Sequence, residues 1–237
     1  MSTPSYGLST HEIIERFDTP AAAKKYAASL IGTATDRREK RCITRALASV
    51  PAGSYVLDMP CGTGRLLPFL GSRGYRLAAS DSSPHMIEFA RQMAAEHNLG
   101  MGDDDFRVAD VFSSGFADDT FDAVVCNRLL HHFSDSLDRQ RALAELGRIC
   151  RGTIVVSFFC SQGWDAIASR IRDAIRRRRL TDRIPIPYRT FARDVAAAGL
   201  TVQDVIPTRP LISKQWYVSL NRGGHGAALR PTTTANP

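Results

Sequence analysis

Short apolar runs alternate with amphipathic segments through the middle of the chain. Five runs have the length and composition of β-strands, at residues 54–58, 75–80, 105–110, 121–126 and 152–159. Between the last two runs, Leu143, Leu146 and Ile149 recur at helical spacing. Ser83 followed by Pro84 is a strong helix start, with Ser83 as the N-cap. Strands that alternate with helices predict βαβ units and a mostly parallel sheet.

The two ends of the chain follow other patterns. Residues 10–48 are expected to be helical, and residues 190–200 to form a capped helix that ends at Gly199. Two runs near the end predict a pair of antiparallel strands, 201–207 and 215–220. The last stretch has no apolar period and is expected to be disordered. We therefore expect a helical cap over 1–48, an α/β domain over 49–221 with a lid at about 160–189, and a tail over 222–237.

Composition places the chain among ordinary globular proteins. It has 237 residues, of which 43% are hydrophobic and 23% are charged. No apolar run approaches the roughly 20 residues that span a bilayer, and the N-terminus lacks the pattern of a secretory signal. The five cysteines are odd in number and widely spaced, which argues against a disulfide framework and a zinc site. A cytoplasmic location is the default expectation.

The net charge of +7 is concentrated in one segment. Residues 165–183 hold seven arginines against three aspartates. Trp164, Ile167, Ile171 and Ile175 recur there every three or four residues and form an apolar stripe. A cationic face beside such a stripe, at 170–183, is compatible with an anionic acceptor, a membrane surface or, less well, nucleic acid. A solvated helix face explains it equally well.

The stretch "VLDMPCGTGRLL", residues 56–67, places a glycine turn directly after a strand. Such a turn lets the backbone approach a cofactor closely. Gly62 and Gly64 fit the first two places of the dinucleotide fingerprint, but Leu67 occupies the third. The Lys-Ser or Lys-Thr pair of a phosphate-binding P-loop is also missing.

Three acidic residues make the glycine turn more specific. Asp58, Asp81 and Asp110 each stand at the end of a predicted strand. Because the carboxyl ends of parallel strands meet in one crevice, the three carboxylates are expected to line it. The acid after the second strand can accept hydrogen bonds from both hydroxyls of a ribose, and the one after the third can meet an adenine amino group. Such a crevice suits a cationic nucleoside better than a pyrophosphate.

Four segments in order resemble the motifs of class I S-adenosylmethionine-dependent methyltransferases. They are "VLDMPCGTGRLL", "ASDSSPHMIEFAR", "DFRVADVFSSGFADDTFDAVVCNRLLHHF" and "FARDVAAAGLTV". The likeness spans about residues 20–221 and is to the small bacterial type that includes the quinone-biosynthesis methyltransferases. It departs from the family at Pro60, which replaces the first glycine of the turn. The resemblance implies a Rossmann-like α/β fold with a doubly wound, mostly parallel seven-stranded sheet, an N-terminal helical cap, an antiparallel last strand, and S-adenosylmethionine as cofactor.

The resemblance also assigns cofactor-binding roles by position. The methionine part would be surrounded by Asp58, Pro60, Cys61, Gly62, Gly64 and Asn127. The ribose and adenine would be held by Asp81, Ser82, Met86, Asp110 and Val111. Ordinary packing is the alternative for Ser82, Met86 and Val111.

The acceptor side carries one candidate for acid–base chemistry. His131 and His132 follow the fourth predicted strand, and imidazole is suited to removing a proton near neutral pH. Simple packing or capping is the alternative for both, and no acid cluster nearby indicates a metal.

We therefore expect an enzyme that methylates O or N of a small or lipid-linked acceptor, anionic acceptors included. The alternatives are an RNA methyltransferase and a non-catalytic protein of the same fold that binds the cofactor or nucleic acid. The Asn-Pro-Pro-aromatic motif for amide or base nitrogens is absent after the fourth predicted strand, where "NRLLHH" stands.

Overall fold

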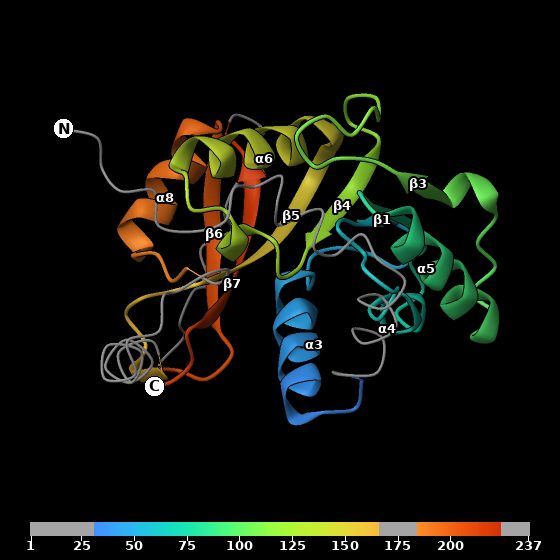
Figure 1. Cartoon of the computed structure of the whole chain (residues 1–237), viewed down its shortest axis with the longest axis horizontal. Coiled ribbons are helices and arrows are strands. Elements are labelled where there is room, and N and C mark those ends of the chain that lie inside the picture. Colours follow the sequence, from blue (N-terminus) through green and yellow to red (C-terminus); the bar gives the residue numbers. More distant parts are fainter. Residues whose placement is uncertain (1–30, 166–183, 224–237) are drawn as a thin grey trace, which may run out of the picture.

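A seven-stranded sheet forms the centre of the computed structural model, which describes residues 31–165 and 184–223 (Figure 1). In chain order its strands are β1 (Tyr55–Asp58), β2 (Arg76–Asp81), β3 (Phe106–Val108), β4 (Phe121–Cys126), β5 (Cys150–Phe159), β6 (Leu200–Pro207) and β7 (Gln215–Arg222). The spatial order is β3-β2-β1-β4-β5-β7-β6. The strands β1 to β5 run parallel, whereas β7 is antiparallel to β5 and to β6. The predicted mostly parallel sheet with an antiparallel last strand is confirmed.

Helices cover both faces of the sheet, as the doubly wound prediction requires. The α-helices are α3 (Ala34–Ala46), α4 (Leu67–Gly71), α5 (Pro84–Glu96), α6 (Ser136–Ile149) and α8 (Tyr188–Ala197). Residues from α3, α4 and α5 pack in one buried apolar cluster, and residues from α6 and α8 pack in another. Within β4, Ala123 and Val125 belong to the first cluster and Val124 and Cys126 to the second. Alternation along a strand therefore supplies both cores.

Local signals in the sequence determine where α5, the helix that packs against the glycine turn, begins. Ser83 is the N-cap of α5, and its hydroxyl accepts a hydrogen bond from the backbone N–H of Met86 at 3.3 Å. Pro84 occupies the first turn, where the missing N–H costs nothing. This start fixes the position of α5 at the end of β2, next to the pocket described below.

The third strand is shorter than expected. The sequence predicts 105–110, but β3 ends at Val108. Asp110 instead forms a tight turn, in which its carboxylate accepts a hydrogen bond from the N–H of Phe112 at 2.9 Å. Aspartate favours such turns over strand continuation because its side chain caps the backbone two residues on.

Several expectations lie outside the described residues. They concern the helical segment up to residue 30 with Phe17 and Tyr26, the arginine-rich segment with its apolar stripe beyond Asp165, and most of the tail. The three-part domain division stays a prediction, although α3 shows that the part of the cap region from Ala34 to Ala46 is helical. Among the described residues, no helix is long and apolar enough to cross a membrane.

Candidate active site

The chain turns tightly between β1 and α4, and glycine makes the turn possible. Gly62 and Gly64 have φ angles of 53° and 78°, in the left-handed region that L side chains rarely adopt. The N–H of Cys61 donates to the carbonyl of Ser80 at 2.8 Å, which ties the turn to β2. A Cβ on Gly64 would lie 2.9 Å from the Cα of Ala90 in α5. Gly64 therefore brings the turn against α5 and does not line the pocket itself.

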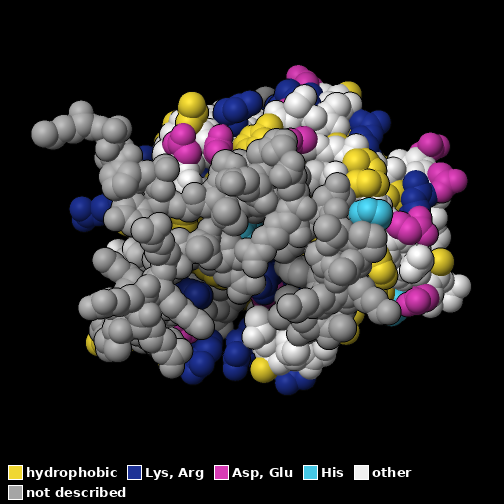
Figure 2. Space-filling model, viewed as in Figure 1, with side chains coloured by type: hydrophobic (Ala, Val, Ile, Leu, Met, Phe, Trp, Pro, Cys, Tyr) yellow, Lys and Arg dark blue, Asp and Glu magenta, His cyan; other side chains and the backbone are white. Residues whose placement is uncertain are grey.

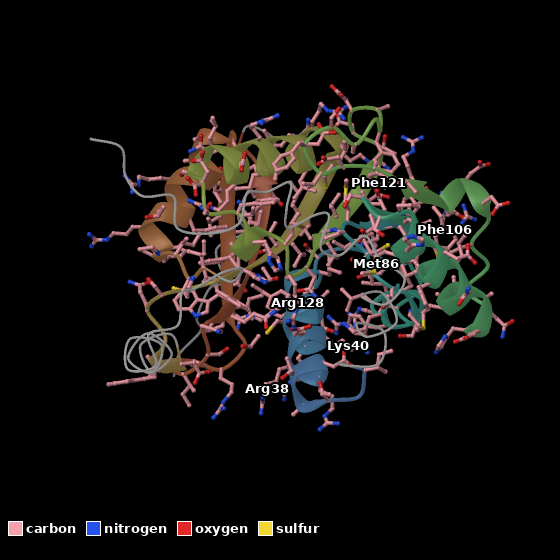
Figure 3. All side chains as sticks on the ribbon, viewed as in Figure 1. Arg38, Lys40, Met86, Phe106, Phe121 and Arg128 are labelled. Atoms are coloured by element: carbon pink, nitrogen blue, oxygen red, sulfur yellow. The ribbon has the colours of Figure 1, made fainter. Side chains whose placement is uncertain are left out.

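A pocket opens at the carboxyl ends of β1, β2 and β4. It holds about 860 Å³ of empty space, including the part that is open to solvent. Its lining is Asp58, Pro60, Cys61, Gly62, Thr63, Arg65, Leu66, Asp81, Ser82, Met86, Asn127, Arg128, Leu129, His132 and Phe133. Figure 3 shows Arg128 above α3 and Met86 on the side of α5, so two separate parts of the fold enclose the pocket. Eight of the eleven residues that the resemblance assigns to the cofactor thus lie around one pocket.

The side chain of Asp58 is the most unusual group in this pocket. It is 1% exposed, and neither carboxylate oxygen has a hydrogen-bond partner among the described residues. Burial raises the pKa of Asp58 to about 8; Asp81 adds to this, and the guanidinium of Arg65 opposes it. A buried carboxyl without a partner is costly for an isolated protein. In a pocket, a carboxyl with so strongly raised a pKa marks a candidate functional residue.

Asp81, by contrast, is already well held. Its Oδ2 accepts a hydrogen bond from the N–H of Gly62 at 2.8 Å, and its Oδ1 accepts one from the N–H of Ser83 at 3.1 Å. The carboxylate thus joins the glycine turn to the start of α5. Its role is structural in part, and carboxylate oxygens have further lone pairs for a hydroxyl ligand.

A smaller cavity adjoins the pocket and contains Asp110 and Val111. The two cavities share Pro60, Asp81, Ser82, Leu129 and Phe133 in their lining. Val111 is 8% exposed, and its side chain also belongs to the apolar core. Asp110 is exposed at the rim. The positions assigned to adenine therefore lie next to those assigned to the ribose.

The two histidines have different environments, although they are adjacent in the short 3-10 turn Leu130–His132. His132 lines the pocket. His131 is 1% exposed and stacks on the ring of Phe159, with a centroid distance of 3.9 Å and an interplanar angle of 3°. Its carbonyl accepts a hydrogen bond from the N–H of Ile184 at 2.9 Å. Only His132 is placed to contact a ligand in the pocket.

Six lining residues could not be predicted from the sequence, namely Thr63, Arg65, Leu66, Leu129, Phe133 and Arg128. Arg65 follows the glycine turn directly, and this position was its only local signal. Arg65 and Arg128 both form ion pairs with acids of α3. Arg65 pairs with Asp36 and Glu39, and Arg128 pairs with Glu39. These pairs join residues 26 to 89 positions apart in the sequence, so no local pattern could reveal them.

Metal binding has no support in the described part of the chain, where no group of three or more His, Cys, Asp or Glu side chains could hold an ion. All five cysteines are free and buried. Burial raises the pKa of Cys61 well above its ordinary value, with Asp81 and Asp58 adding to the shift. Cys61 is therefore a neutral part of the pocket wall and not a reactive thiolate.

Comparison with known protein families shows similarity to methyltransferases. Residues 56–152 match the sequence model of a methyltransferase domain family. The chain is 32% identical over 152 residues to a demethylmenaquinone methyltransferase of Clavibacter sepedonicus, covering 62% of this chain and 58% of the relative. It is 34% identical over 97 residues to a ubiquinone biosynthesis O-methyltransferase of Xanthomonas axonopodis, covering 40% and 39%. A probable tRNA methyltransferase 9B of Bos taurus is 32% identical over 97 residues, covering 41% and 19%. The chain thus spans about three-fifths of the first relative and less of the other two.

Solved structures show the same fold. Magnesium protoporphyrin IX methyltransferase from Synechocystis, solved with bound SAH, superposes with a TM-score of 0.71 at 15% identity and covers 90% of this chain and all of its own. The [4+2]-cyclase SpnF superposes with a TM-score of 0.68 at 14% identity, covering 92% and 98%. The fold therefore occurs in proteins described by different reactions, and the domain match and the relatives carry the assignment. In its domain match, its relatives and its fold, the chain is therefore similar to the class I S-adenosylmethionine-dependent methyltransferases.

Proposed function

We propose that the chain binds S-adenosylmethionine in the pocket at the ends of β1, β2 and β4, and transfers its methyl group to O or N of a small or lipid-linked acceptor. One observation carries the proposal. Asp58 offers two buried, unpartnered carboxylate oxygens to the pocket, and Asp81 adds a second acid. S-adenosylmethionine carries a sulfonium and an ammonium group, and these positive charges would pair with the two acids.

The chain's residues would divide the work of methyl transfer between holding and proton removal. Bound S-adenosylmethionine would supply an electrophilic methyl group on a positively charged sulfur; its methyl C–S bond would break and S-adenosylhomocysteine would leave as a neutral thioether. Asp81 and Ser82 hold the ribose, and the turn at Gly62 brings backbone close to the ligand. His132 accepts the proton that the acceptor O–H or N–H loses as its new bond to the methyl carbon forms. Positioning in a site with little water supplies the rest of the rate.

The apolar part of the lining favours an acceptor with an apolar body. Phe133 follows His132 directly in the sequence, Leu129 lies three residues before it, and Leu66 is a further apolar lining residue outside the positions assigned to the cofactor. Two relatives are named for the biosynthesis of quinones, which agrees with such an acceptor. An anionic acceptor and a membrane surface as partner are extensions of this proposal that depend on the arginine-rich segment 170–183. A cytoplasmic location is likewise part of the proposal.

Methylation of RNA is the second candidate, because one relative is named as a probable tRNA methyltransferase. The absence of the Asn-Pro-Pro-aromatic motif after β4 favours the small-molecule acceptor. Transfer of labelled methyl groups to lipid, small-molecule, RNA and protein fractions of a cell extract distinguishes the two. Label in the RNA fraction alone would replace the first candidate with the second.

Calorimetry with S-adenosylmethionine, S-adenosylhomocysteine and NAD tests the cofactor directly. We expect heat from both adenosyl ligands and none from NAD, because the third glycine of the dinucleotide fingerprint is missing and acids line the pocket. Binding of NAD, or no binding of either adenosyl ligand, would contradict the proposed function.

Replacement of Asp81 by asparagine tests the ribose site. We expect Asp81→Asn to weaken S-adenosylhomocysteine binding by about 1.5–3 kcal/mol, the range for hydrogen bonds to a charged group. Asparagine keeps an oxygen that can accept from Gly62 or Ser83, so circular dichroism should remain that of the folded protein. Glu88→Gln, an exposed acid on α5, is the control and should bind as the wild type does. Equal affinities for both variants would remove Asp81 from the ribose site.

A further inference from the structure

A fully buried carboxylate of α3 joins two sides of the pocket. Glu39 is 0% exposed and does not line the pocket itself. Its Oε2 accepts hydrogen bonds from Nη2 of Arg65 at 2.6 Å and, at the limit of bonding, from Nδ2 of Asn127 at 3.5 Å. Its Oε1 accepts one from Nη1 of Arg128 at 3.0 Å. All three donors line the pocket. One side chain thus connects the turn after β1 with the loop after β4.

Further contacts fix the same side chains. Arg65 also pairs with Asp36 in the first turn of α3. Asn127 Oδ1 accepts hydrogen bonds from the hydroxyls of Tyr217 at 2.8 Å and Ser157 at 3.0 Å. Because the amide oxygen is used by these two donors, the amide nitrogen is turned toward Glu39. The orientations of Arg65 and Asn127 are therefore set from both sides, and Glu39 lies at the point where the bonds converge.

The ion-paired side chains around Glu39 carry a net positive charge. Asp36 and Glu39 carry two negative charges, and Arg65, Arg128 and Lys40, which is 2.9 Å from Asp36, carry three positive charges. The group thus has an excess of one positive charge. Figure 2 shows Lys and Arg side chains gathered around the part of this face where α3 lies. The excess is the ammonium of Lys40, because the two guanidiniums balance the two carboxylates; the cations that line the pocket are Arg65 and Arg128, and arginine binds a ligand carboxylate in a planar, bidentate manner.

An acidic side chain lies close to these arginines. Asp58 lines the same pocket, and its electrostatic interaction with Arg65 shows that the two groups are near one another. The pocket therefore presents an unpartnered acid beside two arginines. This pattern is complementary to the zwitterionic end of an α-amino acid, in which one carbon carries both an ammonium and a carboxylate. The methionine part of the proposed cofactor is such a group, whereas its adenosine part is neutral.

We propose that Glu39 is a positioning residue for the amino-acid end of the cofactor: it holds Arg65 and Arg128 in the geometry that binds the carboxylate there. The proposal rests on the proposed function. A buried carboxylate must offset its own desolvation through its ion pairs, and one that served only to attach α3 would need no partner that lines the pocket. Glu39 instead directs its bonds to pocket-lining donors, and its removal would leave Arg128 without this ion pair and Arg65 held by Asp36 alone.

Two ligands that differ only at this end of the cofactor test the proposal. S-adenosylhomocysteine carries the amino-acid part, and 5′-methylthioadenosine has the same adenosine and sulfur without it. We expect Glu39→Gln to weaken binding of S-adenosylhomocysteine about 10- to 100-fold, the loss typical of charge-assisted hydrogen bonds. Binding of 5′-methylthioadenosine should stay within about twofold, because no contact of Glu39 reaches the adenosine side. Affinities are measured by calorimetry, or by competition for the weaker ligand.

Matched variants separate positioning from general support of the fold. Arg45→Gln removes an exposed ion pair from the same helix, Arg45 to Asp204 at 2.9 Å, and should change neither affinity. Glu39→Asp keeps the charge but shortens the side chain, and should recover part of the lost affinity for S-adenosylhomocysteine. If Glu39→Gln does not fold by circular dichroism, Arg128→Gln, at the less buried end of the same pair, should show the same ligand-selective loss.

The outcomes distinguish this proposal from the proposed function. Equal weakening of both ligands by Glu39→Gln would show a purely structural role and overturn the proposal, and so would unchanged affinity for both. Binding of S-adenosylhomocysteine without any binding of 5′-methylthioadenosine by the wild type would contradict the division of the pocket on which the proposal rests. If the wild type binds neither ligand, the proposed function itself fails.

Discussion

Replacement of His132 by alanine should reduce kcat about 10²- to 10⁴-fold, the usual loss when a general base is removed. His132 lines the pocket, in the loop after β4, and Phe133 beside it in the sequence lines the pocket too. Its neighbour His131 lies in the core against Phe159. Cofactor affinity should change little, because the proposed adenosine and methionine contacts lie elsewhere in the pocket. The measurement is turnover of the acceptor identified by the extract screen, together with calorimetry on S-adenosylhomocysteine.

The adjacent histidine provides the matched control. His131→Phe keeps an aromatic ring that can stack on Phe159, so both folding and turnover should stay near wild-type values. A large loss in His131→Phe with normal turnover in His132→Ala would reverse the assignment. Full activity in both variants would mean that the acceptor needs no base and that rate depends on positioning alone.

The site residues that directly follow a strand could be predicted, because the apolar runs in the sequence show where the strands end. Apolar runs gave the positions of β1, β2 and β4, and parallel strands bring their carboxyl ends together. Asp58 and Asp81 thus fell around one pocket, and Asp110 in the adjoining cavity, without knowledge of any distance between them, whereas Asn127 was assigned by the family resemblance. Ser83 and Pro84 fixed the start of α5 through backbone chemistry that acts over four residues.

Contacts that depend on tertiary structure were beyond the sequence. The adjacent positions of His131 and His132 contain no sign that one ring lies in the core and the other in the pocket, because a short 3-10 turn decides their directions. Glu39 occupies a buried position in a helix whose sequence, "ATDRREKRCITRA", is mostly polar. Only the folded chain brings the glycine turn and the β4 loop to it. The sequence pattern of α3 could therefore predict a helix, but not its partners.

The ionisation of Asp58 should make cofactor binding depend on pH. In the free protein burial raises the pKa of Asp58 to about 8, so its carboxyl is mostly protonated at pH 7. A bound cation favours the ionised form and lowers that pKa. Binding below about pH 8 therefore releases a proton, and affinity should rise with pH, by at most tenfold per unit, before it levels off above about pH 8. The ligand has titrating groups of its own, so the quantity to compare is the difference between the wild type and Asp58→Asn.

Asparagine at position 58 should weaken S-adenosylmethionine binding at pH 8.5 by about 2–5 kcal/mol, the range for truncating one partner of a buried charge pair.

Stability of the free protein should respond in the opposite sense. An acid whose pKa is raised by folding costs nothing below its unfolded pKa of about 3.9, and destabilises progressively as pH rises to its folded pKa of about 8. The wild type should therefore lose unfolding free energy relative to Asp58→Asn by up to about 1.4 kcal/mol per pH unit across that range. Denaturant titrations of both proteins between pH 4 and 9 measure the difference. Parallel stability curves, or an affinity difference that does not change with pH, would show that the carboxyl of Asp58 is ionised before the cofactor binds.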